Sequence, residues 1–217
     1  MSENVDVLEG GVRHGEHTVV VLDDDPSILS GLDNLLTAYG YRVRLYLHKE
    51  AFFSGGMPPP PACLVLDNQL GNGMSGAQVH AEVQLRGWFL PTVFVTAHWN
   101  LQSVVHAMRT GADGFLTKPY DPAEMVTAVA QALRYSLNHQ RASSLAAKAR
   151  DRALALTAPE CAIVRCVAAG LPNKEIAAQL GLSLDVVKAR RGRAMRKMGA
   201  GNVAELARLA ALAGIIG

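Results

Sequence analysis

Cysteine is scarce in this sequence, which has three among 217 residues. Cys63, Cys161 and Cys166 are odd in number and lack the spacing of a metal site, so we expect free thiols packed in the core and neither a disulfide nor a zinc centre. An apolar stretch of 18 residues and a recognisable signal peptide are also lacking. We therefore expect a cytoplasmic protein without a membrane partner.

Neither sign of charge dominates, since 21 Lys and Arg face 19 Asp and Glu and leave a net charge of +2. The distribution is uneven, however: residues 1–120 have a net charge of −5, residues 121–150 of +2 and residues 151–217 of +5. An acidic first part and a basic last part suggest two tasks, and the basic part is a candidate for binding nucleic acid. The length allows one large or two small domains.

The first part of the chain alternates apolar runs with helical patterns, five times over from Thr18 onward. Runs rich in β-branched residues are typical of buried strands, and repeated βα units with short connections indicate an α/β doubly wound domain with a central parallel sheet. Strands are expected near residues 18–22, 41–47, 63–67, 91–95 and 115–118, and helices near 26–40, 50–54, 75–86 and 100–109 and from 121 onward.

Four parts of the chain differ in pattern. Residues 1–17 lack apolar periodicity and are expected to form a loose tail, and residues 18–134 form the α/β domain. Glycine and proline are absent from residues 123–156, which favours a helical linker over residues 135–152, with a break near Asn138 as an option. Residues 153–217 contain four short helical patterns and are expected to form a small all-α domain.

Polar groups follow four of the predicted strands: Asp23 to Asp25, Asp67, Thr96 and Lys118. Because the carboxyl ends of parallel strands face one crevice, these groups should converge there. The carboxylates of Asp23, Asp24 and Asp67 would repel one another without a cation, and hard oxygen ligands of this kind suit Mg²⁺. A carboxylate in such a site can accept a phosphoryl group, with Mg²⁺ and Lys118 neutralising charge and Thr96 donating its hydroxyl.

These residues lie in motifs that resemble those of the receiver domain of bacterial two-component response regulators: Val-Leu-Asp23-Asp24-Asp25-Pro, Leu-Val-Leu-Asp67, Val-Phe-Val-Thr96-Ala97-His98 and Gly-Phe115-Leu-Thr-Lys118-Pro119. The resemblance covers about residues 18–134 and implies that Asp67 accepts phosphate from a sensor histidine kinase. It implies that Asp23, Asp24 and the Gln69 carbonyl help Asp67 to hold Mg²⁺. It further implies that Thr96 and Phe115 are switch residues, that Lys118 is the catalytic lysine and that the Lys118–Pro119 peptide is cis.

The loop after Asp67 departs from the pattern of that family. Gly71 stands where the family usually has a proline, and Gly76 lies nine residues after Asp67, one more than usual. Residues 70–76 are therefore expected to form a longer and freer loop. We expect slower phosphorylation or a shorter-lived acyl phosphate, with Gln69 and His98 beside the phosphoryl group tuning the access of water.

The last part of the chain indicates a helix-turn-helix module. Capping residues at Thr157 with Glu160, at Ser183 and at Asn202 delimit helices near residues 158–169, 173–180, 184–198 and 203–213, with a tight turn at Gly181. In the third helix, a stripe of apolar residues is expected to be buried, namely Val187, Ala194 and Met198. The opposite face combines cations with two small residues and can approach the major groove of DNA; its residues are Lys188, Ala189, Gly192, Arg193 and Arg196.

Residues 153–213 resemble the LuxR-type helix-turn-helix domain, on motifs such as Ala168-Ala-Gly-Leu-Pro-Asn-Lys-Glu-Ile-Ala177. The resemblance implies that residues 184–198 are the recognition helix. It also implies a dimerisation helix at 202–213, whose Val203, Leu206, Leu209 and Leu212 supply either the dimer surface or the core. Candidate DNA contacts are Lys188, Arg190, Arg191, Arg193, Arg196 and Lys197. Arg190 and Gly192 depart from the family, so the DNA sequence that relatives bind is not transferable.

Both resemblances together point to the FixJ/NarL class of response regulators. We expect a DNA-binding transcriptional regulator, and not an enzyme, that phosphorylation of Asp67 converts to a homodimer on promoter DNA, with RNA polymerase as a possible partner. Two alternatives stay open: a DNA-binding regulator that works without phosphate, and a phosphohydrolase with an aspartyl-phosphate intermediate. Gln69 argues against the phosphohydrolase, whose usual signature has a second carboxylate at that position.

Overall fold

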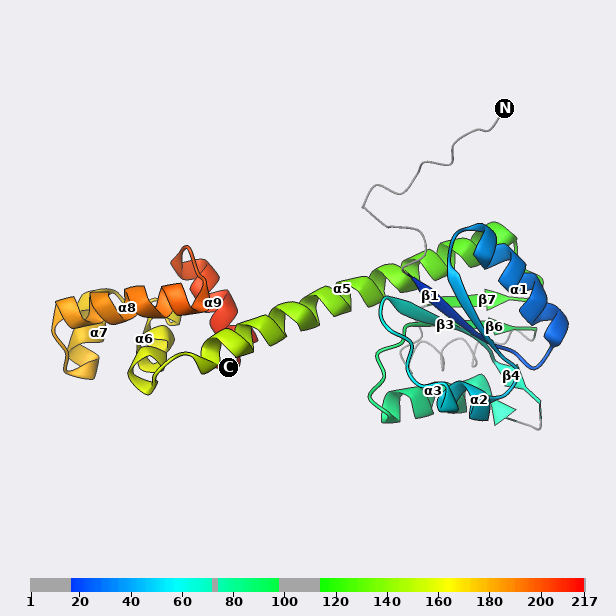
Figure 1. Cartoon of the computed structure of the whole chain (residues 1–217), viewed down its shortest axis with the longest axis horizontal. Coiled ribbons are helices and arrows are strands. Elements are labelled where there is room, and N and C mark those ends of the chain that lie inside the picture. The colour runs from blue at the N-terminus through cyan, green and yellow to red at the C-terminus, as the bar shows by residue number, and fades with distance from the viewer. Residues whose placement is uncertain (1–16, 72–73, 98–113, 217) are drawn as a thin grey trace, which may run out of the picture. The chain divides into compact units, whose positions relative to one another are not determined.

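The computed structural model describes residues 17–71, 74–97 and 114–216. The chain forms two compact units, which we call the first unit (Met1–Gln140) and the second unit (Arg141–Gly217). In the residues described, the first unit is a sheet covered by helices and the second is entirely helical (Figure 1). Within the described part of the chain, no helix has the length and apolar character needed to span a membrane.

A parallel sheet of five strands forms the centre of the first unit. Every residue of its strand β1 is buried, which explains why that run is apolar without interruption. The strand order β2-β1-β3-β6-β7 confirms the predicted doubly wound sheet, since the chain moves outward from β1 first to one side and then to the other. The strands are β1 (Thr18–Leu22), β2 (Arg42–Tyr46), β3 (Ala62–Asp67), β6 (Thr92–Thr96) and β7 (Gly114–Thr117).

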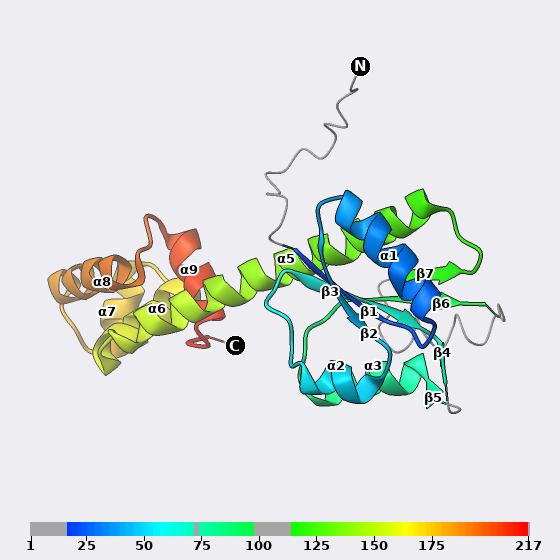
Figure 2. The ribbon, with the colours of Figure 1, turned by 45° about the vertical axis from the view of Figure 1, so that its right-hand side comes forward.

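Helices cover both faces of this sheet. On one face lie α1 (Pro26–Ala38) and α5 (Pro122–Leu154), and on the other α2 (Lys49–Ser54) and α3 (Gly76–Leu85) (Figure 1, Figure 2). Successive residues of β1 serve opposite faces, because Val19 packs with α1 and α5 whereas Val20 packs with α2 and α3. With both faces covered, the ends of the strands are left for polar side chains.

The turn from β1 into α1 divides three neighbouring carboxylates between two tasks. Asp25 caps the helix as predicted, since its Oδ1 accepts a hydrogen bond of 2.8 Å from the Ser27 N–H. The helix ends before Gly40, whose φ of 81° is a conformation that favours glycine. Asp25 is therefore committed to the helix, and Asp23 and Asp24 are left for the strand-end site.

Two details of the first unit differ from those expected. Helix α5 continues without interruption from Pro122 to Leu154, so the break suggested near Asn138 is wrong. His17, assigned to the tail, is buried, and its carbonyl accepts a hydrogen bond of 3.0 Å from the Arg42 N–H. The helix expected near residues 100–109, like His98, lies outside the described residues.

Four helices of the second unit, close to the predicted positions, pack around one core together with the C-terminal part of α5, which contributes Ala149. Gly181 ends α7 with a φ of 62°, which produces the tight turn into α8. Ser183 caps α8, its Oγ accepting a hydrogen bond of 3.4 Å from the Val186 N–H. The helices are α6 (Ala158–Ala168), α7 (Asn173–Leu180), α8 (Leu184–Met198) and α9 (Val203–Leu212).

Helix α9 serves the core of the second unit more than its surface. Leu206 is fully buried and Leu209 is buried beside it. Val203 is exposed, and Leu212 packs on the core only in part. Of the four residues suggested for a dimer surface, two are therefore core residues, and Val203 and Leu212 are left for contact with another molecule.

Candidate functional site

Three carboxylates meet at the carboxyl edge of the sheet. Asp23 directly follows β1 and Asp67 is the last residue of β3, and these two strands are neighbours in the sheet. One carboxylate oxygen from each of Asp23, Asp24 and Asp67 lies within 4.8 Å of the other two. Asp23 is buried, Asp67 is partly buried and Asp24 is exposed, so the cluster is open to solvent at Asp24.

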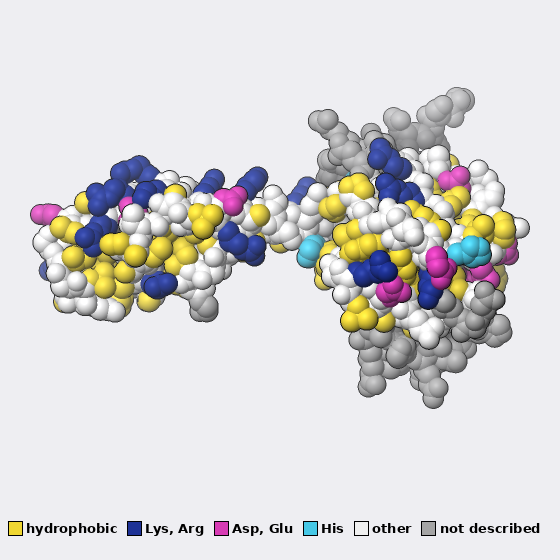
Figure 3. Space-filling model, turned by 60° about the horizontal axis from the view of Figure 1, so that its bottom comes forward, with side chains coloured by type: hydrophobic (Ala, Val, Ile, Leu, Met, Phe, Trp, Pro, Cys, Tyr) yellow, Lys and Arg dark blue, Asp and Glu magenta, His cyan; other side chains and the backbone are white. Residues whose placement is uncertain are grey.

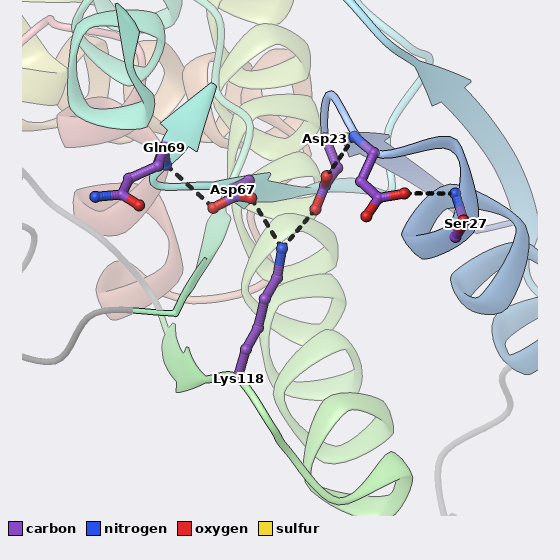
Figure 4. Close-up of polar contacts among 6 residues, drawn as sticks. Asp23, Ser27, Asp67, Gln69 and Lys118 are labelled. Atoms are coloured by element: carbon purple, nitrogen blue, oxygen red, sulfur yellow. Dashed lines mark hydrogen bonds and ion pairs between the residues drawn. The ribbon is translucent and has the colours of Figure 1, made fainter. Parts of the chain in front are cut away.

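Lys118 joins this cluster from the segment that follows β7. Its Nζ lies 2.8 Å from Asp23 Oδ2 and 2.8 Å from Asp67 Oδ2 (Figure 4). Burial alone would lower the pKa of Lys118, but its hydrogen bonds to the two carboxylates outweigh burial and raise that pKa above its usual value. The ammonium therefore stays charged at neutral pH. The Lys118–Pro119 peptide is cis, as the resemblance implied.

The cluster retains an excess of negative charge, since it holds three carboxylates and one ammonium, which is bonded to two of them. A divalent cation would balance the two negative charges that remain. Mg²⁺ prefers a few protein oxygens, completed by water and phosphate oxygens, and the spacing of Asp23, Asp24 and Asp67 fits that preference. The residues of this edge are therefore suited to hold the ion.

Thr96 and Phe115 lie on β6 and β7, the next strands in the sheet after β3. Thr96 is fully buried at the end of its strand, and its carbonyl accepts a hydrogen bond of 2.7 Å from the Lys118 N–H. Phe115 is partly buried against the core that α2 and α3 share with the sheet. The structure thus brings Thr96 to the same edge as Asp67 and Lys118, whereas Phe115 lies one strand further out.

The loop after Asp67 forms a small hairpin, which the sequence did not reveal. Strand β4 (Gln69–Leu70) pairs with the antiparallel strand β5 (Met74–Ser75), so three residues of the loop expected over 70–76, namely Leu70, Met74 and Ser75, lie in paired strands. The Gln69 N–H donates a hydrogen bond of 3.1 Å to Asp67 Oδ1 (Figure 4). The first residue of the hairpin is therefore hydrogen-bonded to the Asp67 carboxylate. Just after β4, a Cβ at Gly71 would lie 3.0 Å from Asp24 Oδ2, so the glycine leaves room for this carboxylate.

Gly76 allows a close approach of two backbone segments, since a Cβ there would collide with the Asp67 carbonyl oxygen and lie 3.0 Å from Asn68 Cα. Because backbone atoms cannot turn aside, Gly76→Ala should destabilise the first unit by about 1–3 kcal/mol. Urea unfolding followed by tryptophan fluorescence measures the change. Gly31→Ala is the matched control, because a Cβ at Gly31 meets no atom within 4 Å. A Gly76→Ala variant as stable as the wild type would contradict the close approach.

The basic face predicted for α8 is present in the second unit. Its buried stripe is the predicted one: Val187, Ala194 and Met198. The cations on its outer side are exposed or partly buried: Lys188, Arg193 and Arg196 exposed, Arg190 partly buried. On the side of the second unit that Figure 3 presents, Lys and Arg side chains gather while Asp and Glu are few.

Two other cations of α8 are bonded within the second unit. The Arg191 Nη1 donates a hydrogen bond of 2.8 Å to Asn173 Oδ1. The Lys197 Nζ lies 2.6 Å from Glu160 Oε2. Neither Glu160 nor Asn173 was predicted as a partner, because these contacts join residues 37 and 18 positions apart and no local pattern marks them.

Two family models match the chain. Residues 19–130 match the response regulator receiver domain, and residues 154–210 match the bacterial regulatory proteins of the luxR family. The transcriptional regulatory protein FixJ of Azorhizobium caulinodans is 34% identical, over 91% of this chain and 93% of that protein. This chain belongs to the FixJ/NarL class of response regulators.

Further relatives and solved structures support the assignment of this chain to that class of response regulators. Nodulation protein W of Bradyrhizobium diazoefficiens is 34% identical over 91% of this chain and 86% of that protein. The solved structure of the response regulator StyR matches with a TM-score of 0.77 and 32% identity, covering 90% of this chain and 98% of StyR. Full-length FixJ from B. japonicum matches with a TM-score of 0.56 and 27% identity, covering 94% and 100%. The protein is thus a DNA-binding transcriptional response regulator switched by phosphorylation, as the resemblances implied.

Proposed function

We propose that Asp67 accepts the phosphoryl group, and that a sensor histidine kinase supplies it. The observation that supports this most directly is the position of Lys118, whose ammonium lies 2.8 Å from both Asp23 and Asp67 within the three-carboxylate cluster. An Asp67 oxygen would attack the phosphorus of a phosphohistidine, the P–N bond would break, and an aspartyl phosphate would form as the histidine leaves. Mg²⁺, held by Asp23, Asp24, Asp67 and the Gln69 carbonyl, would supply positive charge to the phosphoryl oxygens.

The residues around Asp67 would position it for this step. Its Oδ1 accepts a hydrogen bond from the Gln69 N–H and its Oδ2 accepts one from Lys118, so the carboxylate is held from both sides. As one oxygen forms the bond to phosphorus, the ammonium can pass to a phosphoryl oxygen. Thr96 would then turn its hydroxyl toward the phosphoryl group and let Phe115 repack, which makes these two the switch residues of the proposal.

The outer face of α8 would read the DNA. Lys188, Arg193 and Arg196 are its exposed cations, and the recognition helix of a helix-turn-helix lies in the major groove. Phosphorylation would favour a homodimer, and two linked recognition helices on a two-fold promoter site bind more tightly than one. At the promoter, the regulator would also contact RNA polymerase. Promoter DNA of a bacterial cell lies in the cytoplasm, so the regulator would act in that compartment.

DNA affinity with and without beryllofluoride tests this switch. The probe is a duplex that the wild-type protein enriches from a random pool, and binding is followed by fluorescence anisotropy in the presence of Mg²⁺. Beryllofluoride mimics a phosphoryl group on a carboxylate, so it should tighten binding by about tenfold or more through dimerisation. Asp67→Asn should not respond. Equal affinities in all four measurements would defeat the proposed switch.

A regulator that works without phosphate is the second candidate. The hairpin beside Asp67, with Gly71 just after β4 where the family usually has a proline, is the observation that favours it. Phos-tag electrophoresis after treatment with acetyl phosphate separates the two candidates. A retarded band that Asp67→Asn abolishes supports the first, and no retarded band supports the second. We do not propose a phosphohydrolase, because Gln69 stands where that class has its second carboxylate.

A further inference from the structure

Arg191 is one of six cations on α8, and it is turned toward the protein. Its Nη1 donates a hydrogen bond of 2.8 Å to Oδ1 of Asn173, the first residue of α7. Arg191 follows the fully buried Val187 by four residues, which places it about 40° around the helix from the buried stripe. The guanidinium therefore joins the two helices of the helix-turn-helix.

Lys197 makes a second link, from α8 to α6. Its Nζ lies 2.6 Å from Oε2 of Glu160, whose side chain is only 5% exposed. The same oxygen accepts hydrogen bonds from the Thr157 N–H, at 2.9 Å, and from the Thr157 hydroxyl, at 3.0 Å. The bond from Lys197 is the largest of the causes that lower the pKa of Glu160 to about 2. Glu160 and Lys197 are therefore both ionised in the folded protein near neutral pH.

The exposed cations of α8 are held more loosely. The side chain of Lys188 is 58% exposed, and its partner Asp185 lies 3.8 Å away and is 94% exposed. The side chain of Arg193 is 51% exposed, and its Nε lies 3.6 Å from Glu160 Oε1, beyond a good hydrogen bond. Such pairs contribute little to stability, so these side chains can turn to a phosphate. Lys197 differs, because its departure would leave the buried Glu160 carboxylate with the longer contact to Arg193, at 3.6 Å, in place of a bond of 2.6 Å.

We propose that Arg191 and Lys197 are positioning residues, which fix the recognition helix on α7 and α6, and that the other cations of α8 make the contacts with DNA. The proposal rests on α8 being the recognition helix and states which of its residues touch the DNA. Arg191 fixes the packing of α8 on α7, and Lys197 holds the C-terminal part of α8 on α6. Loss of either side chain would make the binding orientation of α8 less populated in the free protein and so weaken DNA binding. The phosphate contacts made in the complex by the other cations would remain.

The salt dependence of DNA binding separates these two roles. A cation that neutralises a DNA phosphate contributes about 0.9 to the slope of log K against log salt concentration. A residue that only positions the helix contributes nothing to this slope, although its loss weakens binding at every salt concentration. The slope is thus a readout that a structural role does not change.

The experiment titrates the full-length protein with the enriched duplex at several KCl concentrations. Arg191→Gln and Lys197→Gln are compared with Arg193→Gln and Arg196→Gln, which remove exposed cations from the same helix. The slope should fall by about 0.9 in each of the last two variants. In Arg191→Gln and Lys197→Gln the slope should stay at the wild-type value while affinity falls by about tenfold.

Asn173→Ala gives an independent check on Arg191, because it removes the same hydrogen bond without touching a cation. It should weaken binding as much as Arg191→Gln does, and the double variant should be no weaker than either single variant. Circular dichroism confirms the folding of each variant. Should Lys197→Gln fail to fold, the double variant Glu160→Gln with Lys197→Met takes its place, since it leaves no buried charge unpaired.

Two results would overturn different conclusions. A slope reduced by about 0.9 in Arg191→Gln, or in Lys197→Gln or its replacement, would assign that residue to a phosphate contact and refute its positioning role. Wild-type slopes in all four single variants would instead show that α8 is not the DNA-binding face. Wild-type slopes in all four variants would thus refute DNA binding by α8, whereas a reduced slope in Arg191→Gln or Lys197→Gln would leave that role intact.

Discussion

Replacing Lys118 with methionine should lower the rate at which acetyl phosphate phosphorylates Asp67 by about a hundredfold or more. The ammonium lies 2.8 Å from both Asp23 and Asp67, where it can follow the charge that moves onto the phosphoryl oxygens. Methionine keeps much of the length and apolar volume of the side chain but cannot donate a hydrogen bond. Phos-tag electrophoresis of samples quenched at intervals gives the rate.

The controls for this prediction separate charge from shape. Lys148→Met removes an exposed lysine of the second unit and should leave the rate unchanged. Lys118→Arg keeps the charge on a planar, bulkier group and should recover only part of the rate. Because the pKa of Lys118 is raised, its ammonium should persist as the pH rises from about 6 to about 9, and the rate should not fall on this account. A methionine variant as fast as the wild type would show that the ammonium takes no part in the transfer.

The sheet could be predicted from the sequence because its inner strands are buried on both faces. β1 and β6 are buried at every position, so each reads as one apolar run that ends at a polar group. The starts of helices could also be predicted, because capping contacts are local in sequence. Asp25 and Ser183 accept hydrogen bonds from N–H groups two and three residues away. β4 and β5 have two residues each, too few for a periodic pattern, and their pairing depends on how the chain passes Asp67.

The acidic cluster followed from topology, whereas the roles of the α8 cations did not. Parallel strands end at one edge, so the meeting of Asp23 with Asp67 required only the strand assignment. The six cations of α8 look alike in sequence, and Arg191 and Lys197 differ from the others only because tertiary packing brings partners to them. For the same reason the apolar pattern of α9 did not predict that Leu206 is buried and Val203 is exposed.

Replacing Glu160 with alanine should destabilise the second unit by roughly 2–4 kcal/mol. The carboxylate accepts a charge-assisted hydrogen bond of 2.6 Å from Lys197 and caps α6 through the Thr157 N–H at 2.9 Å. Alanine removes both contributions at once and leaves the N–H without its acceptor. Glu175→Ala, which removes an exposed acid of α7, is the matched control and should change stability by less than about 0.5 kcal/mol.

The two units have separate optical signals, which make the measurement specific. Both tryptophans and all five tyrosines precede residue 141, so tryptophan fluorescence reports on the first unit while far-ultraviolet circular dichroism reports on the helices of both. In urea, Glu160→Ala should move part of the dichroism transition to lower concentration and leave the fluorescence transition in place. Unchanged dichroism, or an equal shift of both signals, would contradict the local role of Glu160.

The pH dependence of stability isolates the charge of Glu160 from its shape. Because the pKa of Glu160 is lowered from 4.5 to about 2, its contribution is fully present above a pH of about 4.5 and is lost progressively as the pH falls toward 2. Glu160→Gln keeps an acceptor for Thr157 but has no group that titrates in this window. The second unit of the wild type should therefore lose more stability than that of Glu160→Gln over the same fall in pH. Parallel curves of stability against pH for the two proteins would mean that Lys197 does not hold the carboxylate ionised. Glu160 would then act only as a cap of α6 and not as a link to the recognition helix.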